Sequence, residues 1–188
     1  MIFEAIEFAV DAHRGQYRKG SRIPYIFHPL NAARTLIEAG CPEPVVVAAI
    51  LHDVVEDTRV TLGEIRRHFG PRVAELVESA TEPSKFWSWE KRKRHTLETL
   101  ETVDGDMLLV AIADKLDNIR SLRNDLEKHG EEIWRRFHRG RQDQAWYYNS
   151  LAEIFDRRLE APPGNALAAE FRSAAAAVFN APSGSSGS

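Results

Sequence analysis

The sequence predicts an all-α protein that folds as a single domain. Apolar residues recur at helical spacing along nearly the whole chain, and no stretch alternates apolar and polar residues as a half-buried strand would. The chain of 188 residues is long enough for one full hydrophobic core and short for two. We therefore expect one helical bundle without internal repeats.

The first elements are defined by apolar spacing and by proline and glycine. Residues 2–13 predict a helix with an apolar stripe. The stripe consists of Phe3, Ile6, Ala9 and Val10. A polar loop follows from Gly15 to Pro24. A second helix opens near Phe27, with Pro29 in its first turn where a missing N–H costs nothing, and it stops before Gly40.

The next helices lead into and out of a buried segment. Pro44 starts the nearly all-apolar run Val45 to Leu51, which should be buried on every side. Thr61 with Glu64 three residues later resembles a capping box and predicts a short helix that ends at Gly70. Residues 71–80 predict another helix.

The second half predicts a charged helix over 88–102 and an amphipathic one over 104–123. The latter should face inward with Leu108, Leu109, Ile112 and Leu116. Residues 131–159 complete the core with Trp134, Phe137, Trp146, Tyr147, Leu151 and Phe155. We expect the main domain over 1–160, a loosely docked alanine-rich accessory helix within 161–180, and a flexible Ser/Gly tail at 181–188.

Bulk properties exclude several classes of protein. The net charge of −3 implies no bulk attraction to nucleic acid. The single cysteine, Cys41, excludes an internal disulfide framework and fits a reducing compartment. The start lacks the pattern of a secretory signal, and no apolar run reaches membrane-spanning length. We expect a cytoplasmic protein.

The most informative segment is His52 to Asp57 (HDVVED), which places one imidazole and three carboxylates at the end of an apolar helix. An ionised carboxylate costs several kcal/mol to bury without a partner, so such a cluster requires an ion or strong hydrogen bonds. Groups three or four residues apart on a helix can project toward one site. The alternative is a solvated helix end with a cap and a few ion pairs.

Two further residues are candidates for the same site. Asp114 follows an uncharged apolar run on another predicted helix, although a pair with Lys115 or Arg120 would also explain it. His28 stands beside Pro29 at a helix start, where a capping or core histidine is the alternative.

Two imidazoles and two carboxylates form a mixed nitrogen and oxygen set that suits one divalent ion, Mn²⁺ or Fe²⁺, with Mg²⁺ or Zn²⁺ as further options. The candidate ligands are His28, His52, Asp53 and Asp114. Such an ion could acidify water and polarise a phosphoryl group. Glu56 and Asp57 then become candidates for positioning or deprotonating the attacking water.

Other polar and aromatic segments have both functional and structural interpretations. Arg18 and Lys19 could hold an anionic substrate, with the arginine also stacking on a base, or could belong to a solvated turn. The cationic run 85–95 could suggest nucleic-acid binding or nuclear targeting, but we interpret it as a solvated helix face. A narrower functional interpretation is that one or two of its cations reach distal phosphates of a substrate. The aromatic cluster 146–148 is expected in the core rather than as a base-stacking platform.

Three motifs, taken in order, resemble the hydrolase domain of the RelA/SpoT alarmone enzymes. They are Gln16-Tyr-Arg-Lys with Pro24-Tyr-Ile-Phe-His-Pro, then His52-Asp-Val-Val-Glu-Asp-Thr, then Asp114-Lys-Leu-Asp-Asn. The resemblance runs from about residue 1 to 155, and single-domain small alarmone hydrolases match best in length. The ordered triplet is specific, whereas a lone His-Asp pair is not.

This resemblance implies an all-α HD-domain fold and Mn²⁺-dependent removal of the 3′-pyrophosphate from (p)ppGpp, leaving GDP or GTP. It places the metal ligands at His28, His52, Asp53 and Asp114. It places the catalytic acid pair at Glu56 and Asp57, and substrate contacts at Arg18, Lys19, Asn118 and Ser121, where the family usually has threonine at the last of these.

The sequence departs from the family pattern in two places. The usual Asp-Arg-Leu-His-Asn reads Asp114-Lys-Leu-Asp-Asn, so Lys115 replaces arginine and Asp117 replaces histidine. The usual Thr-Lys pair appears as Thr81-Glu-Pro-Ser-Lys. Neither change touches the expected metal ligands, but both could alter which nucleotide fits.

Three functions follow from these patterns. The first is alarmone hydrolysis, and the second is hydrolysis of another nucleotide phosphate, such as a nucleoside 5′-monophosphate, at the same site. The third is a non-catalytic nucleotide-sensing module, against which the pair Glu56 and Asp57 argues. We expect a small-molecule nucleotide substrate and no nucleic-acid or membrane partner, and the sequence leaves the oligomeric state open.

Overall fold

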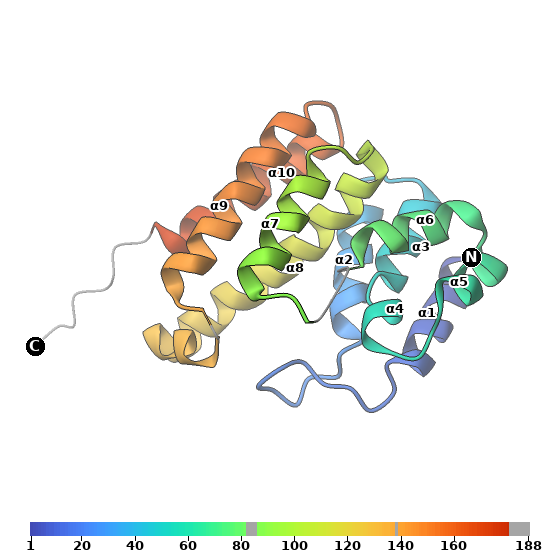
Figure 1. Ribbon diagram of the computed structural model, residues 1–188, viewed down its shortest axis with the longest axis horizontal. Helices are drawn as coiled ribbons and strands as arrows, with labels where there is room; N and C mark the ends of the chain where they lie inside the picture. Colours follow the sequence, from blue (N-terminus) through green and yellow to red (C-terminus); the bar gives the residue numbers. More distant parts are fainter. Residues whose placement is uncertain (82–85, 138, 181–188) are drawn as a thin grey trace, which may run out of the picture.

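The computed structural model describes residues 1–81, 86–137 and 139–180, and over these it is an α-helical bundle (Figure 1). The described elements are, in order, α1 (Ile2–Ala12), α2 (Phe27–Glu38), α3 (Glu43–Leu51), α4 (Val54–Asp57), α5 (Leu62–Phe69), α6 (Pro71–Ala80), α7 (Trp89–Leu100), α8 (Gly105–His129), the 3₁₀ helix η1 (Gly130–Arg136), α9 (Arg141–Arg158) and α10 (Gly164–Phe179). Within these ranges no strand forms, and an isolated bridge joins Tyr17 to Pro24. The predicted all-α class is confirmed.

Helix α8 is the central element of the bundle. It contacts α2, α3 and α6 on one side and α9 and α10 on the other (Figure 1). Its apolar residues Leu108, Leu109, Ile112 and Leu116 are buried as predicted. Because other helices pack against α8 on two sides, its buried polar side chains are held in fixed positions.

Helix α3 forms the core of the first half of the chain. All residues from Val45 to Leu51 are buried, as its uninterrupted apolar sequence predicts. It packs against α1, α2, α6 and α8. The chain leaves α3 at His52, so the packing of this helix fixes where the His-Asp pair emerges.

Several predicted helix boundaries are confirmed. Thr61 accepts a hydrogen bond from the backbone N–H of Glu64, whose side chain in turn accepts one from the N–H of Thr61, and this capping box opens α5. Helix α8 runs six residues beyond the predicted end at 123, to His129, and the following Gly130, with a φ of +61°, ends it. The segment 131–159 divides into η1 and α9.

Two apolar expectations were wrong. Of the expected stripe on α1, Ala9 is buried and Ile6 packs against the core, whereas Phe3 is 80% and Val10 is 39% exposed. The packed face of α1 is centred on Ala5 and Ala9, with Ile2, Ile6 and Phe8 partly buried around them. Phe137, expected in the core, is 38% exposed beside η1.

Helix α10 packs more closely than its composition suggested. It contacts both α8 and α9, and it buries Leu167, Phe171 and Val178. The ring of Phe171 lies edge-on to Phe155, at 5.2 Å between centroids. The expectation of loose docking was therefore wrong, because three large apolar side chains anchor this alanine-rich helix.

Two expectations fall outside the described residues. The first is the tail at 181–188. The second is residues 82–85, which separate Thr81 from the lysine that follows it directly in the family pattern. Among the described helices, none is both long enough and apolar enough to cross a membrane.

Candidate metal centre

Three separate segments bring the four expected ligands together. His28 comes from the first turn of α2, His52 and Asp53 from the turn between α3 and α4, and Asp114 from the middle of α8. Nε2 of His28 lies 3.2 Å from Oδ1 of Asp114 and 3.5 Å from Oδ2 of Asp53. Nε2 of His52 lies 3.0 Å from the same Asp53 oxygen and 3.8 Å from Asp114 Oδ1. Both imidazoles are buried.

Hydrogen bonds behind the imidazoles orient both rings toward this cluster. His28 donates from Nδ1 to Oδ2 of Asp117 at 2.6 Å, because an ionised carboxylate can only accept. His52 donates from Nδ1 to the backbone carbonyl of Ala49 at 2.8 Å. Because the Nδ1 hydrogen of each ring is directed away from the cluster, Nε2 is the ring atom that faces the carboxylates.

The buried charges perturb one another strongly. Burial of His52 favours its neutral form, but Asp53 and Asp114 outweigh that effect and raise its pKa to about 9. Burial of Asp114 favours protonation, yet Lys115, His28 and His52 hold its pKa well below the usual value. Two anionic carboxylates thus face two imidazoles that attract protons. The cluster demands positive charge at its centre.

A divalent cation fits this demand. Nε2 of His52 is buried without a hydrogen-bond partner, since its contact with Asp53 lacks hydrogen-bond geometry. One ligand atom each from His28, His52 and Asp114 lies within 4.8 Å of the others. Adjacent ligands around an octahedral ion at about 2.1 Å are about 3 Å apart, which resembles this spacing. The donor set of nitrogen and oxygen matches a divalent transition metal.

Two neighbours of the cluster were not among the expected site residues. The hydroxyl of Tyr25 donates to Oδ2 of Asp53 at 2.6 Å. Asp117 is 6% exposed and holds His28 from behind. Tyr25 lies within the first quoted motif and Asp117 is a departure from the third, but sequence spacing alone does not reveal contacts between residues so far apart.

The expected catalytic acids lie on α4, the short helix that directly follows the His-Asp pair. The chain turns at His52 and Asp53, so α3 and α4 are separate helices rather than one continuous helix. Glu56 is half-buried and Asp57 exposed on α4. Asp57 lines a surface depression with Gln16, whose amide donates to the Asp57 carbonyl at 2.8 Å. Among the described residues, neither acid is part of the walls of the two cavities beside the cluster.

The four expected substrate-contacting residues line one cavity of about 540 Å³, which His28 also borders. They are Arg18, Lys19, Asn118 and Ser121. One guanidinium nitrogen of Arg18 lies 3.2 Å from Oδ1 of Asn118 and 3.4 Å from Oγ of Ser121. Asn118 also donates to Oδ1 of Asp114 at 2.5 Å, so this asparagine connects the cavity to the cluster.

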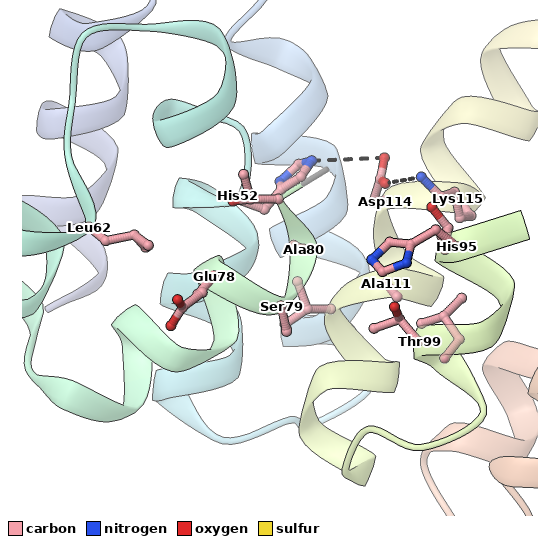
Figure 2. A pocket seen from close by; sticks show the side chains of 14 residues that line it. His52, Leu62, Glu78, Ser79, Ala80, His95, Thr99, Ala111, Asp114 and Lys115 are labelled. Carbon is pink, nitrogen blue, oxygen red and sulfur yellow. Dashed lines mark hydrogen bonds and ion pairs between the residues drawn. The ribbon is translucent and has the colours of Figure 1, made fainter. Parts of the chain in front are cut away.

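A second cavity of about 450 Å³ also borders the cluster (Figure 2). His52 and Asp114 form part of its wall, and Lys115 pairs with Asp114 at 2.6 Å. His95 of α7 also lines this cavity, near Lys115 and Asp114 in Figure 2. The ion pair between Asp114 and Lys115, which was the alternative explanation of Asp114, does form. Asp114 nevertheless also lies in the cluster, next to His28.

The other two ambiguous segments make the structural contacts that the sequence allowed. In the cationic run, Lys91 lies over the ring of Trp87 at 4.0 Å, and Arg94 pairs with Glu90 at 2.9 Å. Tyr147 and Tyr148 are buried, as the core interpretation predicts. Tyr148 also lines the larger cavity.

An all-α bundle with two imidazoles and two carboxylates around one point defines a metal-binding centre of the HD type. The sequence matches the HD domain family over residues 5–145. The chain belongs to this family, and the predicted fold and family resemblance are confirmed.

The chain is similar to several proteins whose names state an activity. The chain is 42% identical over 123 residues to a guanosine-3′,5′-bis(diphosphate) 3′-pyrophosphohydrolase of Aquifex aeolicus, covering 64% of this chain but only 18% of that protein. It is 45% identical over 124 residues to the pyrophosphohydrolase MESH1 of Mus musculus, covering 64% of this chain and 69% of that protein. A solved metazoan SpoT ortholog, described as hydrolysing ppGpp, aligns with a TM-score of 0.74 at 29% identity over 92% of each chain.

Proposed function

We propose that this protein is a Mn²⁺-dependent hydrolase that removes the 3′-pyrophosphate from (p)ppGpp. The observation that carries the proposal is the position of the metal centre at the edge of a cavity lined by Arg18, Lys19, Asn118 and Ser121. The named activity of the MESH1 relative supports the same substrate.

The charge of the larger cavity suits a nucleotide with several phosphates. Arg18, Lys19, Lys128 and Arg136 line it against the two acids Asp117 and Asp125. Arg18 pairs with Asp117 and Arg136 with Asp125, at 3.5 and 3.9 Å. Lys19 and Lys128 are the cations best placed to meet a phosphate group.

The same cavity offers apolar surface for a base. Tyr25, Phe137 and Tyr148 line it. The Arg18 guanidinium lies 5.9 Å from the centroid of the Tyr25 ring, and Asn118 and Ser121 hold it from the side. A guanidinium fixed in this way presents a flat face on which a purine can stack. The base would then lie next to the metal centre.

The metal centre supplies the hydrolytic chemistry. His28, His52, Asp53 and Asp114 would hold the ion, which when bound acts as a Lewis acid toward phosphate oxygens and acidifies water. Glu56 and Asp57, on the α4 helix directly after the His-Asp pair, are proposed to orient and deprotonate the attacking water.

The decisive experiment is incubation of the purified chain with ppGpp and Mn²⁺, followed by anion-exchange separation of the products. We expect GDP and pyrophosphate, with no product after chelation by EDTA. Nucleoside 5′-monophosphates, GTP and 3′-phosphorylated nucleotides form the comparison panel. Binding of ppGpp without turnover at any Mn²⁺ concentration would instead identify a nucleotide sensor.

One observation favours a second candidate, hydrolysis of a different nucleotide phosphate. Asp117 replaces the usual histidine and lies in the wall of the cavity with Arg18. A carboxylate here repels phosphate and neutralises the neighbouring arginine. Faster release of phosphate from a 3′-monophosphate or a 5′-monophosphate than of pyrophosphate from ppGpp would favour this second candidate.

A further inference from the structure

We propose that Asp117 is a positioning residue for the metal centre, which holds the imidazole of His28 in the tautomer and orientation that ligation requires. The inference rests on the proposed metal centre and is independent of the nucleotide. It assigns a role to the residue at which this chain departs most clearly from its family pattern.

The contacts of Asp117 show a carboxylate that is bound on both oxygens. Oδ2 accepts from Nδ1 of His28 at 2.6 Å, and Oδ1 accepts from the side-chain amide of Asn31 at 2.9 Å. Oδ2 also lies 3.5 Å from the Arg18 guanidinium. Asn31 follows His28 by one helical turn on α2, so α2 presents both donors to the same α8 carboxylate.

Burial makes this arrangement rigid. Asp117 is 6% exposed and His28 is 3% exposed, so water does not compete effectively for the bond between them. An anionic acceptor behind a ligating imidazole fixes the proton on Nδ1 and increases electron density at Nε2. Nε2 is the atom that faces Asp53 and Asp114.

The other imidazole provides a comparison within the same site. His52 donates its Nδ1 proton to the backbone carbonyl of Ala49, which is a neutral acceptor. The two ligands are therefore held by chemically different groups, and only the acceptor of His28 can be removed by substitution. This difference makes His52 an internal control for any test of Asp117.

The test measures Mn²⁺ affinity in the absence of nucleotide, by electron paramagnetic resonance of free Mn²⁺. Asp117→Leu removes both charge and acceptor, and we expect its affinity to fall about 100-fold. Asp117→Asn keeps an oxygen acceptor without the charge, and we expect a loss of about tenfold. The matched control is Asp106→Asn, which removes a carboxylate of α8 that hydrogen-bonds Arg72 away from the centre.

A spectroscopic readout separates positioning from a general loss of structure. In the Zn²⁺-loaded protein with ¹⁵N-labelled histidine, protected Nδ1–H signals are expected from both His28 and His52. Asp117→Leu should lose the His28 signal and retain that of His52, whereas Asp106→Asn should retain both. Circular dichroism checks that each variant is folded, and the asparagine variant decides the question if the leucine variant does not fold.

The outcomes discriminate between the two proposals. If the unsubstituted chain binds no Mn²⁺, both the proposed function and this inference are overturned. If it binds Mn²⁺ but the Asp117 variants bind equally well, or lose no more affinity than Asp106→Asn, only the role of Asp117 is refuted. Loss of ppGpp turnover without loss of Mn²⁺ affinity in the Asp117 variants would also refute it.

Discussion

The hydroxyl of Tyr25 donates a 2.6 Å hydrogen bond to the Oδ2 atom of Asp53, the same oxygen that faces both imidazoles of the metal centre. The ring of Tyr25 lies at the end of the polar loop, with the Arg18 guanidinium above it. Tyr25 thus connects the loop that should hold the nucleotide to one carboxylate of the centre.

This bond predicts a measurable effect on metal binding. Tyr25→Phe removes the donor but keeps the ring, so Asp53 loses one of the groups that orient it. We expect Mn²⁺ affinity to fall about tenfold, measured by isothermal titration calorimetry. Tyr17→Phe removes a hydroxyl from an exposed side chain of the same loop and should leave the affinity unchanged. Equal affinities in all three proteins would mean that the Tyr25 bond does not organise the centre.

Substitution of the expected metal ligand Asp53 and of the expected catalytic acid Glu56 should affect metal binding and turnover differently. Asp53→Ala should abolish both Mn²⁺ binding and activity. Glu56→Gln should retain Mn²⁺ and reduce kcat about 10²- to 10⁴-fold, the usual contribution of a general base. Glu64→Gln, on the neighbouring helix α5, serves as the control. Undiminished kcat in Glu56→Gln would remove this residue from the mechanism.

Arg18 is expected to act mainly in nucleotide binding. Its guanidinium is fixed in the cavity by Asn118 and Ser121, whereas Arg22 of the same loop is exposed and lies outside the cavity wall. Arg18→Ala should raise KM for ppGpp about tenfold or more, with a smaller change in kcat, because its contacts would exist before the reaction. Steady-state kinetics of Arg18→Ala and Arg22→Ala check this, and similar KM values for the two would argue against the role.

The stability of the metal-free protein should depend on pH in a defined direction. Although burial favours neutral His52, Asp53 and Asp114 raise its pKa from 6.5 to about 9. A raised pKa stabilises the fold fully below pH 6.5, and this contribution is lost as the pH rises through about 9. In EDTA, we expect the Tm of the unsubstituted protein to fall between pH 6.5 and about 9 by more than the Tm of the His52→Gln variant does.

Saturating Mn²⁺ provides the contrast to the metal-free protein. Bound metal requires neutral imidazoles, so the decline in Tm should become smaller or disappear when the ion is present. Differential scanning calorimetry between pH 6 and pH 9.5 would record both series. Parallel curves for the wild-type protein and His52→Gln in EDTA would contradict the predicted contribution of His52.

Helix α10 should contribute to the stability of the whole bundle. Phe171 of α10 is fully buried, with its ring against Tyr148 and Phe155 of α9, so Phe171→Ala should lower the free energy of unfolding by about 3–5 kcal/mol. Phe3→Ala is the control, since Phe3 is 80% exposed. Urea denaturation measures both. A loss below about 1 kcal/mol for Phe171→Ala would support the looser docking that composition alone suggests.

The helical class and most helix boundaries could be predicted from the sequence because their causes are local. The capping box at Thr61 and the apolar run after Pro44 depend on neighbouring residues only. The packed face of α1 could not be predicted in this way, because it depends on how α1 packs against α3. Phe137 illustrates the same limit, since it lies in the wall of a cavity that only the folded chain forms.

The candidate site was predictable to a different degree. Motif order indicated His28, His52, Asp53 and Asp114, which the fold brings together. The supporting contacts of Tyr25 and Asp117 depend on the relative positions of α2, α3 and α8. Glu56 and Asp57 were expected on the same helix as His52, but α3 ends at Leu51 and a separate helix, α4, begins at Val54.

The carbonyl behind His52 is present whatever residue occupies position 49, whereas the carboxylate behind His28 exists only because position 117 is aspartate. A substitution at position 117 can therefore change the hydrogen bond that holds His28, while the hydrogen bond that holds His52 stays the same. Relatives that differ at position 117 would be expected to differ in how tightly, and with which ion, they load.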